Sequence, residues 1–281
     1  MNAQLGAIAF VVWRESVEAL LVISILDSWL VAQVADPRRP RGFLWSGVAA
    51  GLAVASLLAV ALTGLGDVLS DDAQQVYQTV TVLIAAALII QMLVWMHRHA
   101  RTMKRNLETA LDAAVERRKL WGVFVLALIA VAREGSEMVI FLYGMLSAGA
   151  GGSLASGVVA ALVGVGMTML TYGLLRLAGK RMPWRLFFSI TEVMLMFLAA
   201  ALLMTGIDGL IDLGILPKLS RGLWNTSRVI PDGGAGGGFI SALTGYRAQP
   251  NLMELIAYAA YWAAVLCLLY PRRPSSRTST A

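Results

Sequence analysis

The sequence predicts an all-α, polytopic membrane protein with seven transmembrane helices. Of the 281 residues, 58% are hydrophobic and only 14% are charged, and the apolar residues fall into seven long blocks. A helix rises about 1.5 Å per residue, so about 20 apolar residues cross the roughly 30 Å hydrocarbon core of a membrane. Most connections are short and leave no room for a soluble domain, so we expect residues 1–281 to form a single transmembrane domain.

Each block is long enough to span the membrane. The blocks cover residues 5–31, 42–64, 77–97, 120–147, 153–179, 186–206 and 251–271. The first block contains three charged residues near its middle, which a cleaved signal peptide does not have, so we expect it to remain as a helix. A long loop over residues 207–250 separates the sixth and seventh blocks.

The basic residues predict the orientation. The odd-numbered connections and the carboxyl tail hold 17 of the 23 Lys and Arg residues. Because positive loops stay in the cytoplasm, the amino terminus is expected outside and the carboxyl terminus inside. Topology therefore explains the net charge of +6, and no nucleic-acid partner is expected because no continuous basic face is present. Membrane lipids are the expected surroundings.

A charged five-residue pattern, Arg-Glu-x-x-Glu, occurs twice. It occupies residues 14–18 (Arg-Glu-Ser-Val-Glu) in the first block and residues 133–137 (Arg-Glu-Gly-Ser-Glu) in the fourth. On a helix, the two glutamates of each copy lie three residues apart and share one face, and the arginine precedes the second glutamate by one turn. Each copy can therefore hold a partly neutralised pair of carboxylates.

The two copies lie near the middle of spans that run in opposite directions. Charges at that depth are costly, so the residues must face a protein interior or a water-filled cavity. The opposed directions predict an inverted repeat of three plus three helices, over residues 5–97 and 120–206, with the helix at 251–271 outside it. Transporters place their substrate sites where such halves meet.

The residue types indicate a site for a hard metal cation. Four carboxylates from two helices suit iron, manganese, magnesium or calcium better than copper(I). Against two arginines they leave two negative charges, which a cation can offset. The expected ligands are Glu15, Glu18, Glu134 and Glu137, supported by Arg14 and Arg133. The competing interpretation is structural: each arginine neutralises its own glutamates and helps the helices to pack.

With these motifs the sequence resembles the oxidase-dependent iron permease family, which includes the yeast high-affinity iron permease and bacterial EfeU-like members. The resemblance extends through residues 95–101 (Trp-Met-His-Arg-His-Ala-Arg), 223–227 (Leu-Trp-Asn-Thr-Ser) and 243–246 (Leu-Thr-Gly-Tyr). It implies a permease that imports iron, as Fe2+ or Fe3+, across the cell inner membrane, with the motif glutamates as ligands. Iron is then a substrate and no cofactor is permanently bound. The resemblance also implies periplasmic cupredoxin-like and haem-peroxidase partners.

Two other functions are compatible with intramembrane glutamates. The cargo could be another cation such as manganese or lead, because carboxylate sites select by geometry and availability. A lipid-pyrophosphate phosphatase would need a nucleophile, but Ser16 and Ser136 fall at unmatched positions in the two motifs. We therefore do not expect an enzyme.

Glu192 in the sixth block is a possible secondary site. It lies near the cytoplasmic end, where it could act as an exit ligand or pair with Arg185 or another cytoplasmic cation. His97 and Trp95, at the cytoplasmic end of the third block, are interpreted as interfacial residues.

Overall fold

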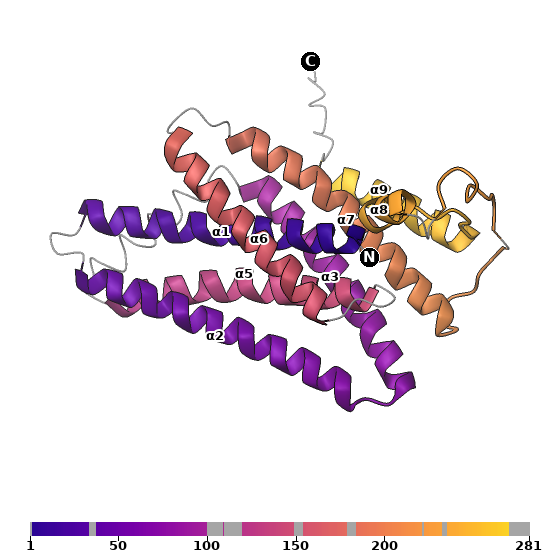
Figure 1. Ribbon diagram of the computed structural model, residues 1–281, viewed down its shortest axis with the longest axis horizontal. Coiled ribbons are helices and arrows are strands. Elements are labelled where there is room, and N and C mark those ends of the chain that lie inside the picture. The colour runs from indigo at the N-terminus through magenta and orange to yellow at the C-terminus, as the bar shows by residue number, and fades with distance from the viewer. Residues whose placement is uncertain are drawn as a thin grey trace, which may run out of the picture.

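The computed structural model describes residues 2–33, 38–99, 109, 120–148, 154–178, 184–220, 222–231 and 235–269. Within these ranges the chain forms eight α-helices and no strand (Figure 1), which confirms the all-α prediction. The helices are α1 (Asn2–Gln33), α2 (Arg38–Val68), α3 (Asp71–His99), α5 (Leu120–Ala148), α6 (Leu154–Ala178), α7 (Trp184–Asp212), α8 (Ala235–Thr244) and α9 (Leu252–Leu269).

Five of the described helices, α2, α3, α6, α7 and α9, are long and apolar enough to cross a membrane. Helices α1 and α5 are also long, at 32 and 29 residues, but each carries the three charged residues of its motif near the middle. The two motif helices therefore need a protein interior around their charges. All seven of these helices overlap a predicted block, and their composition is that of a multi-pass membrane protein.

Helix α7 extends six residues beyond its predicted end. It stops where Gly214 adopts a φ of +73°, a conformation that glycine reaches without strain. The amide of Ile215 donates to the carbonyl oxygen of Leu210 at 3.0 Å and that of Gly214 to Ile211 at 3.0 Å. These are the two hydrogen bonds of a Schellman cap, which satisfy the last carbonyl groups of the helix.

The segment between α7 and α9 contains α8, a helix that the sequence does not predict. α8 ends at Thr244, and the next residue, Gly245, has a φ of +74°. Gly245 lies so close to α7 that an added Cβ would be 3.1 Å from the carbonyl oxygen of Ala200. The hydroxyl groups of Thr226 and Tyr246 are hydrogen-bonded, and Arg247 Nη2 lies 2.7 Å from Asp208 Oδ2 on α7. These contacts fix the segment against the end of α7.

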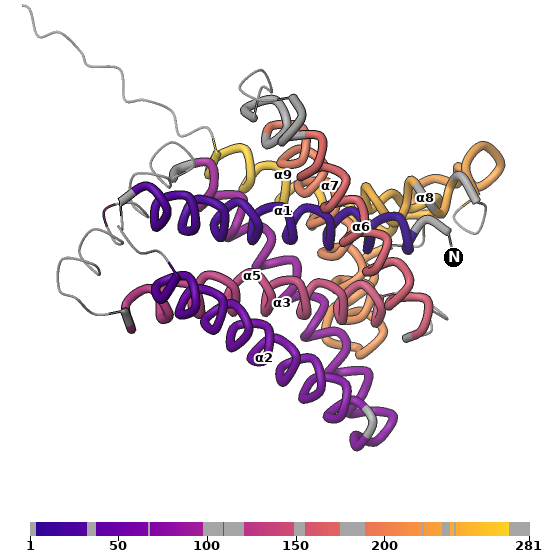
Figure 2. Tube along the Cα trace, turned by 60° about the vertical axis from the view of Figure 1, so that its left-hand side comes forward, coloured from indigo at the N-terminus to yellow at the C-terminus, as the bar shows by residue number. Residues whose placement is uncertain are grey.

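Helices α1 and α5 pack against each other in opposite directions. Gln4, in the first turn of α1, donates a hydrogen bond from Nε2 to the carbonyl oxygen of Met145, near the end of α5, at 2.5 Å. At the other end of α1, Leu26 shares a buried cluster with Val123 and Ala127 from the start of α5. Figures 1 and 2 show the two helices side by side, with α2 along α5 and α6 crossing α1.

At each motif helix, one glycine on a neighbouring helix allows the two helices to approach closely just before the motif. On α2, an added Cβ at Gly51 would be 2.8 Å from Val131 Cβ and 2.9 Å from the amide nitrogen of Ala132 on α5. On α6, an added Cβ at Gly164 would be 2.8 Å from Val12 Cβ and 3.0 Å from the amide nitrogen of Trp13 on α1. In both pairs the glycine therefore faces the two residues that precede the motif arginine.

Candidate metal centre

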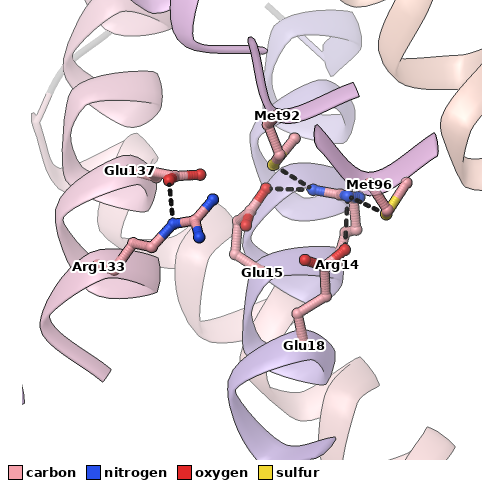
Figure 3. Close-up of polar contacts among 7 residues, drawn as sticks. All are labelled: Arg14, Glu15, Glu18, Met92, Met96, Arg133 and Glu137. Atoms are coloured by element: carbon pink, nitrogen blue, oxygen red, sulfur yellow. Dashed lines mark hydrogen bonds and ion pairs between the residues drawn. The ribbon is translucent and has the colours of Figure 1, made fainter. Parts of the chain in front are cut away.

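The α1 motif is buried at the centre of the molecule. Arg14 and Glu15 are 0% exposed. Nη1 of Arg14 lies 2.7 Å from Glu15 Oε1, and Nη2 lies 2.5 Å from Glu18 Oε1 (Figure 3). Burying a charge costs several kcal/mol, of order 5, unless an opposite charge is close. One guanidinium group therefore serves two carboxylates and offsets one of their two negative charges.

The α5 motif forms the equivalent ion pair in a more open environment. Nε of Arg133 lies 3.0 Å from Glu137 Oε1, and the Arg133 side chain is 39% exposed. The arginine and the second glutamate are one helical turn apart in both motifs, so both form this pair. The two motifs match in sequence and in pairing, but they differ in burial.

Carboxylates from the two helices converge. One carboxylate oxygen each from Glu15, Glu134 and Glu137 lies within 4.8 Å of the others. Figure 3 shows Glu15 and Glu137 pointing into the space between α1 and α5. Oε2 of Glu15 and Oε2 of Glu137 are buried and have no hydrogen-bond partner among the described residues. Buried acceptors of this kind are unfavourable and need a partner.

The spacing of these oxygens suits a small hard cation. Carboxylate oxygens lie about 2.1 Å from such ions, so two ligands on opposite sides are about 4.2 Å apart. The upper limit of 4.8 Å on the separations in this group is close to that distance. Glu18 is not part of this group, and its Oε1 lies 2.5 Å from Arg14 Nη2. Three of the four expected ligands are therefore together, and the fourth is adjacent to them through the arginine.

Comparison with known proteins identifies the family. The model of the iron permease FTR1 family matches residues 5–273. The chain belongs to the FTR1 iron permease family. This is a family of transporters rather than enzymes, so the phosphatase alternative is dropped and the resemblance noted from the motifs is confirmed.

Several curated relatives cover almost the whole chain. The "Ferrous iron permease EfeU" of Escherichia coli O6:H1 is 25% identical over 272 residues, which cover 96% of this chain and 97% of the relative. The EfeU proteins of Yersinia pestis, 25% identical with 96% and 95% covered, and Shigella sonnei, 26% identical with 95% and 97% covered, are similar at the same level. No solved structure matches the chain.

Glu192, which the sequence suggested as a possible secondary site, pairs with a histidine. Oε1 of Glu192 on α7 lies 3.1 Å from Nδ1 of His97 on α3. The Glu192 side chain is 17% exposed and that of His97 is 40% exposed. The side chain of Arg185, the partner considered from the sequence, lies outside the part that the structure describes. His97 therefore contacts a second helix besides lying near the end of its own.

Three residues of α3 complete the surroundings of the permease motifs, and sequence reasoning did not assign them there. Arg14 donates from Nη1 to Met92 Sδ at 2.9 Å and from Nη2 to Met96 Sδ at 3.3 Å. The guanidinium carbon of Arg133 lies 4.6 Å from the centre of the Trp95 ring, within the range of a cation–π interaction. The available signal was their spacing, because residues 92, 95 and 96 share one helical face.

Proposed function

We propose that this permease imports ferrous iron and binds it between α1 and α5. The observation that carries the proposal is the group formed by Glu15, Glu134 and Glu137, whose oxygens come from two helices and lie within 4.8 Å of one another. The unpartnered buried oxygens of Glu15 and Glu137 give an entering cation ready ligands. Glu18 becomes the fourth ligand when it exchanges Arg14 for the ion.

The charge balance favours a divalent cargo. Four motif glutamates and two motif arginines carry a formal net charge of −2, which one Fe(II) ion neutralises. A trivalent ion would leave an excess positive charge in a poorly solvated region, which is costly. The curated relatives are named ferrous iron permeases, which agrees with this choice. Manganese and lead are the competing cargoes, because carboxylates do not separate such ions by ligand type alone.

We further propose seven membrane spans, formed by α1, α2, α3, α5, α6, α7 and α9, in the cell inner membrane. Helices α1–α3 and α5–α7 form an inverted repeat with α9 outside it, the amino terminus outside and the carboxyl terminus in the cytoplasm. The packing supports the repeat, because α2 lies on α5 as α6 lies on α1. The matched positions of Gly51 and Gly164 before the two motifs support it further.

Transport then proceeds by rocking of one half against the other around the bound ion. Glu192 and His97 provide a secondary position for the ion on the cytoplasmic side. Delivery from periplasmic cupredoxin-like and haem-peroxidase partners is part of the proposal on the family resemblance alone.

Isosteric neutralisation of the ligands tests the binding site. Glu15→Gln and Glu134→Gln keep side-chain size but remove the charge, so both should lower uptake of isotopic Fe(II) into proteoliposomes at least tenfold. Glu254→Gln is the matched control, because Glu254 lies at the start of α9 and not in the carboxylate group. Uptake by both ligand variants at the rate of the control would refute the proposed site.

Competition assays test the cargo. An excess of Mn(II) or Pb(II) should reduce isotopic Fe(II) uptake only weakly if iron is the preferred ion. Stronger competition by either metal would reassign the cargo without moving the site.

A further inference from the structure

One face of α3 contacts the arginines of both motifs. Met92, Trp95 and Met96 lie at positions i, i+3 and i+4, so their side chains project from the same side of the helix. The two thioethers accept hydrogen bonds from Arg14, at 2.9 and 3.3 Å, and the indole ring lies 4.6 Å from the guanidinium carbon of Arg133. A single helix therefore contacts two arginines that belong to different motif helices. Figure 3 shows the contacts of Met92 and Met96 with Arg14.

The contacts of Arg14 divide into charged and neutral acceptors. Nη1 is close to both Glu15 Oε1 and Met92 Sδ, and Nη2 is close to both Glu18 Oε1 and Met96 Sδ. Thioether sulfur is a weak, uncharged acceptor. Since Arg14 is 0% exposed, no bulk water takes part. The balance between the sulfurs and the carboxylates therefore decides how firmly the arginine holds the glutamates.

A metal ion at the carboxylate group competes with Arg14 for the same glutamates. Glu15 is both a partner of Arg14 and a member of the three-carboxylate group. Any acceptor that draws the guanidinium group toward α3 weakens its hold on Glu15 and Glu18 and leaves their oxygens more available to the ion. A side chain without an acceptor at the same place on α3 strengthens the hold of Arg14 on the two glutamates, because its N–H groups then have only the carboxylates as acceptors.

We propose that Met92, Trp95 and Met96 are positioning residues that set the iron affinity of the site by controlling how tightly the motif arginines hold the glutamates. The inference rests on the proposed function, since it assumes that the carboxylates bind the transported ion. It assigns control over both Arg-Glu-x-x-Glu motifs to α3, a helix that carries neither of them. Trp95 acts on Arg133 through its ring face, which attracts the cation without competing for a carboxylate.

Substitution of Met96 by residues of similar size separates positioning from packing. Met96→Leu removes the acceptor, and Met96→Gln replaces it with a stronger, neutral one. We expect Leu to raise the KM for Fe(II) uptake about three- to tenfold, the effect of losing one hydrogen bond, and Gln to give a KM at or below that of the unaltered protein. A pure packing role predicts the reverse order, because burial of an amide is less favourable than burial of Leu.

Met92→Leu and Met92→Gln provide a second, independent pair in which the same order is expected. Met204→Leu is the control, since Met204 is 2% exposed on α7 and should leave KM unchanged. Titration of the purified protein with Fe(II) under anaerobic conditions should give dissociation constants in the same order as the KM values. This readout does not depend on transport rate, and it remains available if a variant inserts but moves iron slowly.

The outcomes separate this inference from the proposed function. If the unaltered protein takes up and binds Fe(II), and the Leu and Gln variants shift KM in the same direction or not at all, the positioning role is wrong and the permease function stands. If the unaltered protein neither binds nor transports Fe(II), the proposed function itself fails. A raised KM in the Leu variant and a KM at or below that of the unaltered protein in the Gln variant, at both methionines and with no shift at Met204, establish the positioning role.

Discussion

Replacement of Gly51 or Gly164 by alanine should impair transport through the motif that each glycine faces. The Cβ added at Gly51 would be 2.8 Å from Val131 Cβ, and the one added at Gly164 would be 2.8 Å from Val12 Cβ. Carbon atoms in favourable contact are about 3.5–4.0 Å apart. Each pair of helices must therefore separate by roughly 0.7–1 Å at a point two residues before a motif arginine.

The expected effect on stability is smaller than the effect on transport. Overpacking costs about 1–3 kcal/mol, and replacing glycine by alanine inside a helix returns about 1 kcal/mol. A net loss of about 0–2 kcal/mol leaves the protein folded. A displacement of about 1 Å at a binding site can cost a factor of about 100 in rate, so we expect Fe(II) uptake per folded molecule to fall ten- to hundredfold in both variants.

The controls come from the same two helices. Gly64 on α2 and Gly166 on α6 have no described atom within 4 Å of an added Cβ, so Gly64→Ala and Gly166→Ala should transport normally and unfold at the same or a slightly higher temperature. Uptake into proteoliposomes and thermal unfolding in detergent would be measured for all four variants. Normal uptake by Gly51→Ala and Gly164→Ala would refute the reasoning, and loss in only one of them would contradict a matched repeat.

Four further substitutions give distinct expected results. Arg14→Lys should lower Fe(II) uptake only partly, because lysine keeps the charge but cannot bridge two carboxylates; full activity would show that the planar guanidinium group is not needed. Arg133→Lys should have a smaller effect, since that side chain is 39% exposed. Glu192→Gln should lower Vmax severalfold with an unchanged KM, whereas a raised KM would place it in the entry step. Asn251→Ala should lower the Tm by a few degrees, because it removes the hydrogen bond from the Glu254 amide to Asn251 Oδ1 at 2.9 Å. This bond caps the start of α9, and such a cap contributes about 1 kcal/mol. An unchanged Tm would contradict this role.

The sequence predicted the long helices and the pairing within each motif because both depend on local spacing. The apolar blocks located α1, α2, α5, α6 and α9 to within four residues, whereas α3 begins six residues before its block and α7 ends six residues beyond its own. The distance of four residues between Arg14 and Glu18 brought their side chains together on one helical turn. The same spacing placed Arg133 beside Glu137. Interactions of this range need no knowledge of the tertiary structure.

Helix α8 could not be predicted because its stability comes from neighbouring segments. Its sequence begins Ala-Gly-Gly-Gly, and glycine disfavours a helix by about 1 kcal/mol relative to alanine. The helix packs on α1 and α7, and a Cβ added at Gly237 would collide with the carbonyl oxygen of Pro231. Close packing around small residues therefore outweighs the local preference, and a single sequence carries no signal of that packing.

The different burial of Arg14 and Arg133 was also beyond the sequence, because burial depends on how the other helices pack around each motif. Helices α3 and α7 share the run Ala-Ala-Ala-Leu, at residues 85–88 and 199–202. Counted from that run, the α7 positions that correspond to Met92 and Trp95 are both glycines, Gly206 and Gly209. In the proposed repeat, the two halves would therefore match in their motifs but differ at these positions of their third helices.

Gly206 and Gly209 of α7 make different contacts from Met92 and Trp95, the α3 residues at the corresponding positions. A Cβ added at Gly209 would be 2.5 Å from Thr79 Oγ1, and one at Gly206 would collide with the side chain of Leu83, both on α3. Helix α7 uses these positions to approach α3 closely, whereas α3 uses its bulky side chains to hold both motif arginines. Among the described residues, α3 supplies these contacts, so in the proposed repeat the second half would not reproduce the contacts of the first. We therefore expect the two motifs, although they share one sequence pattern, to contribute unequally to iron binding.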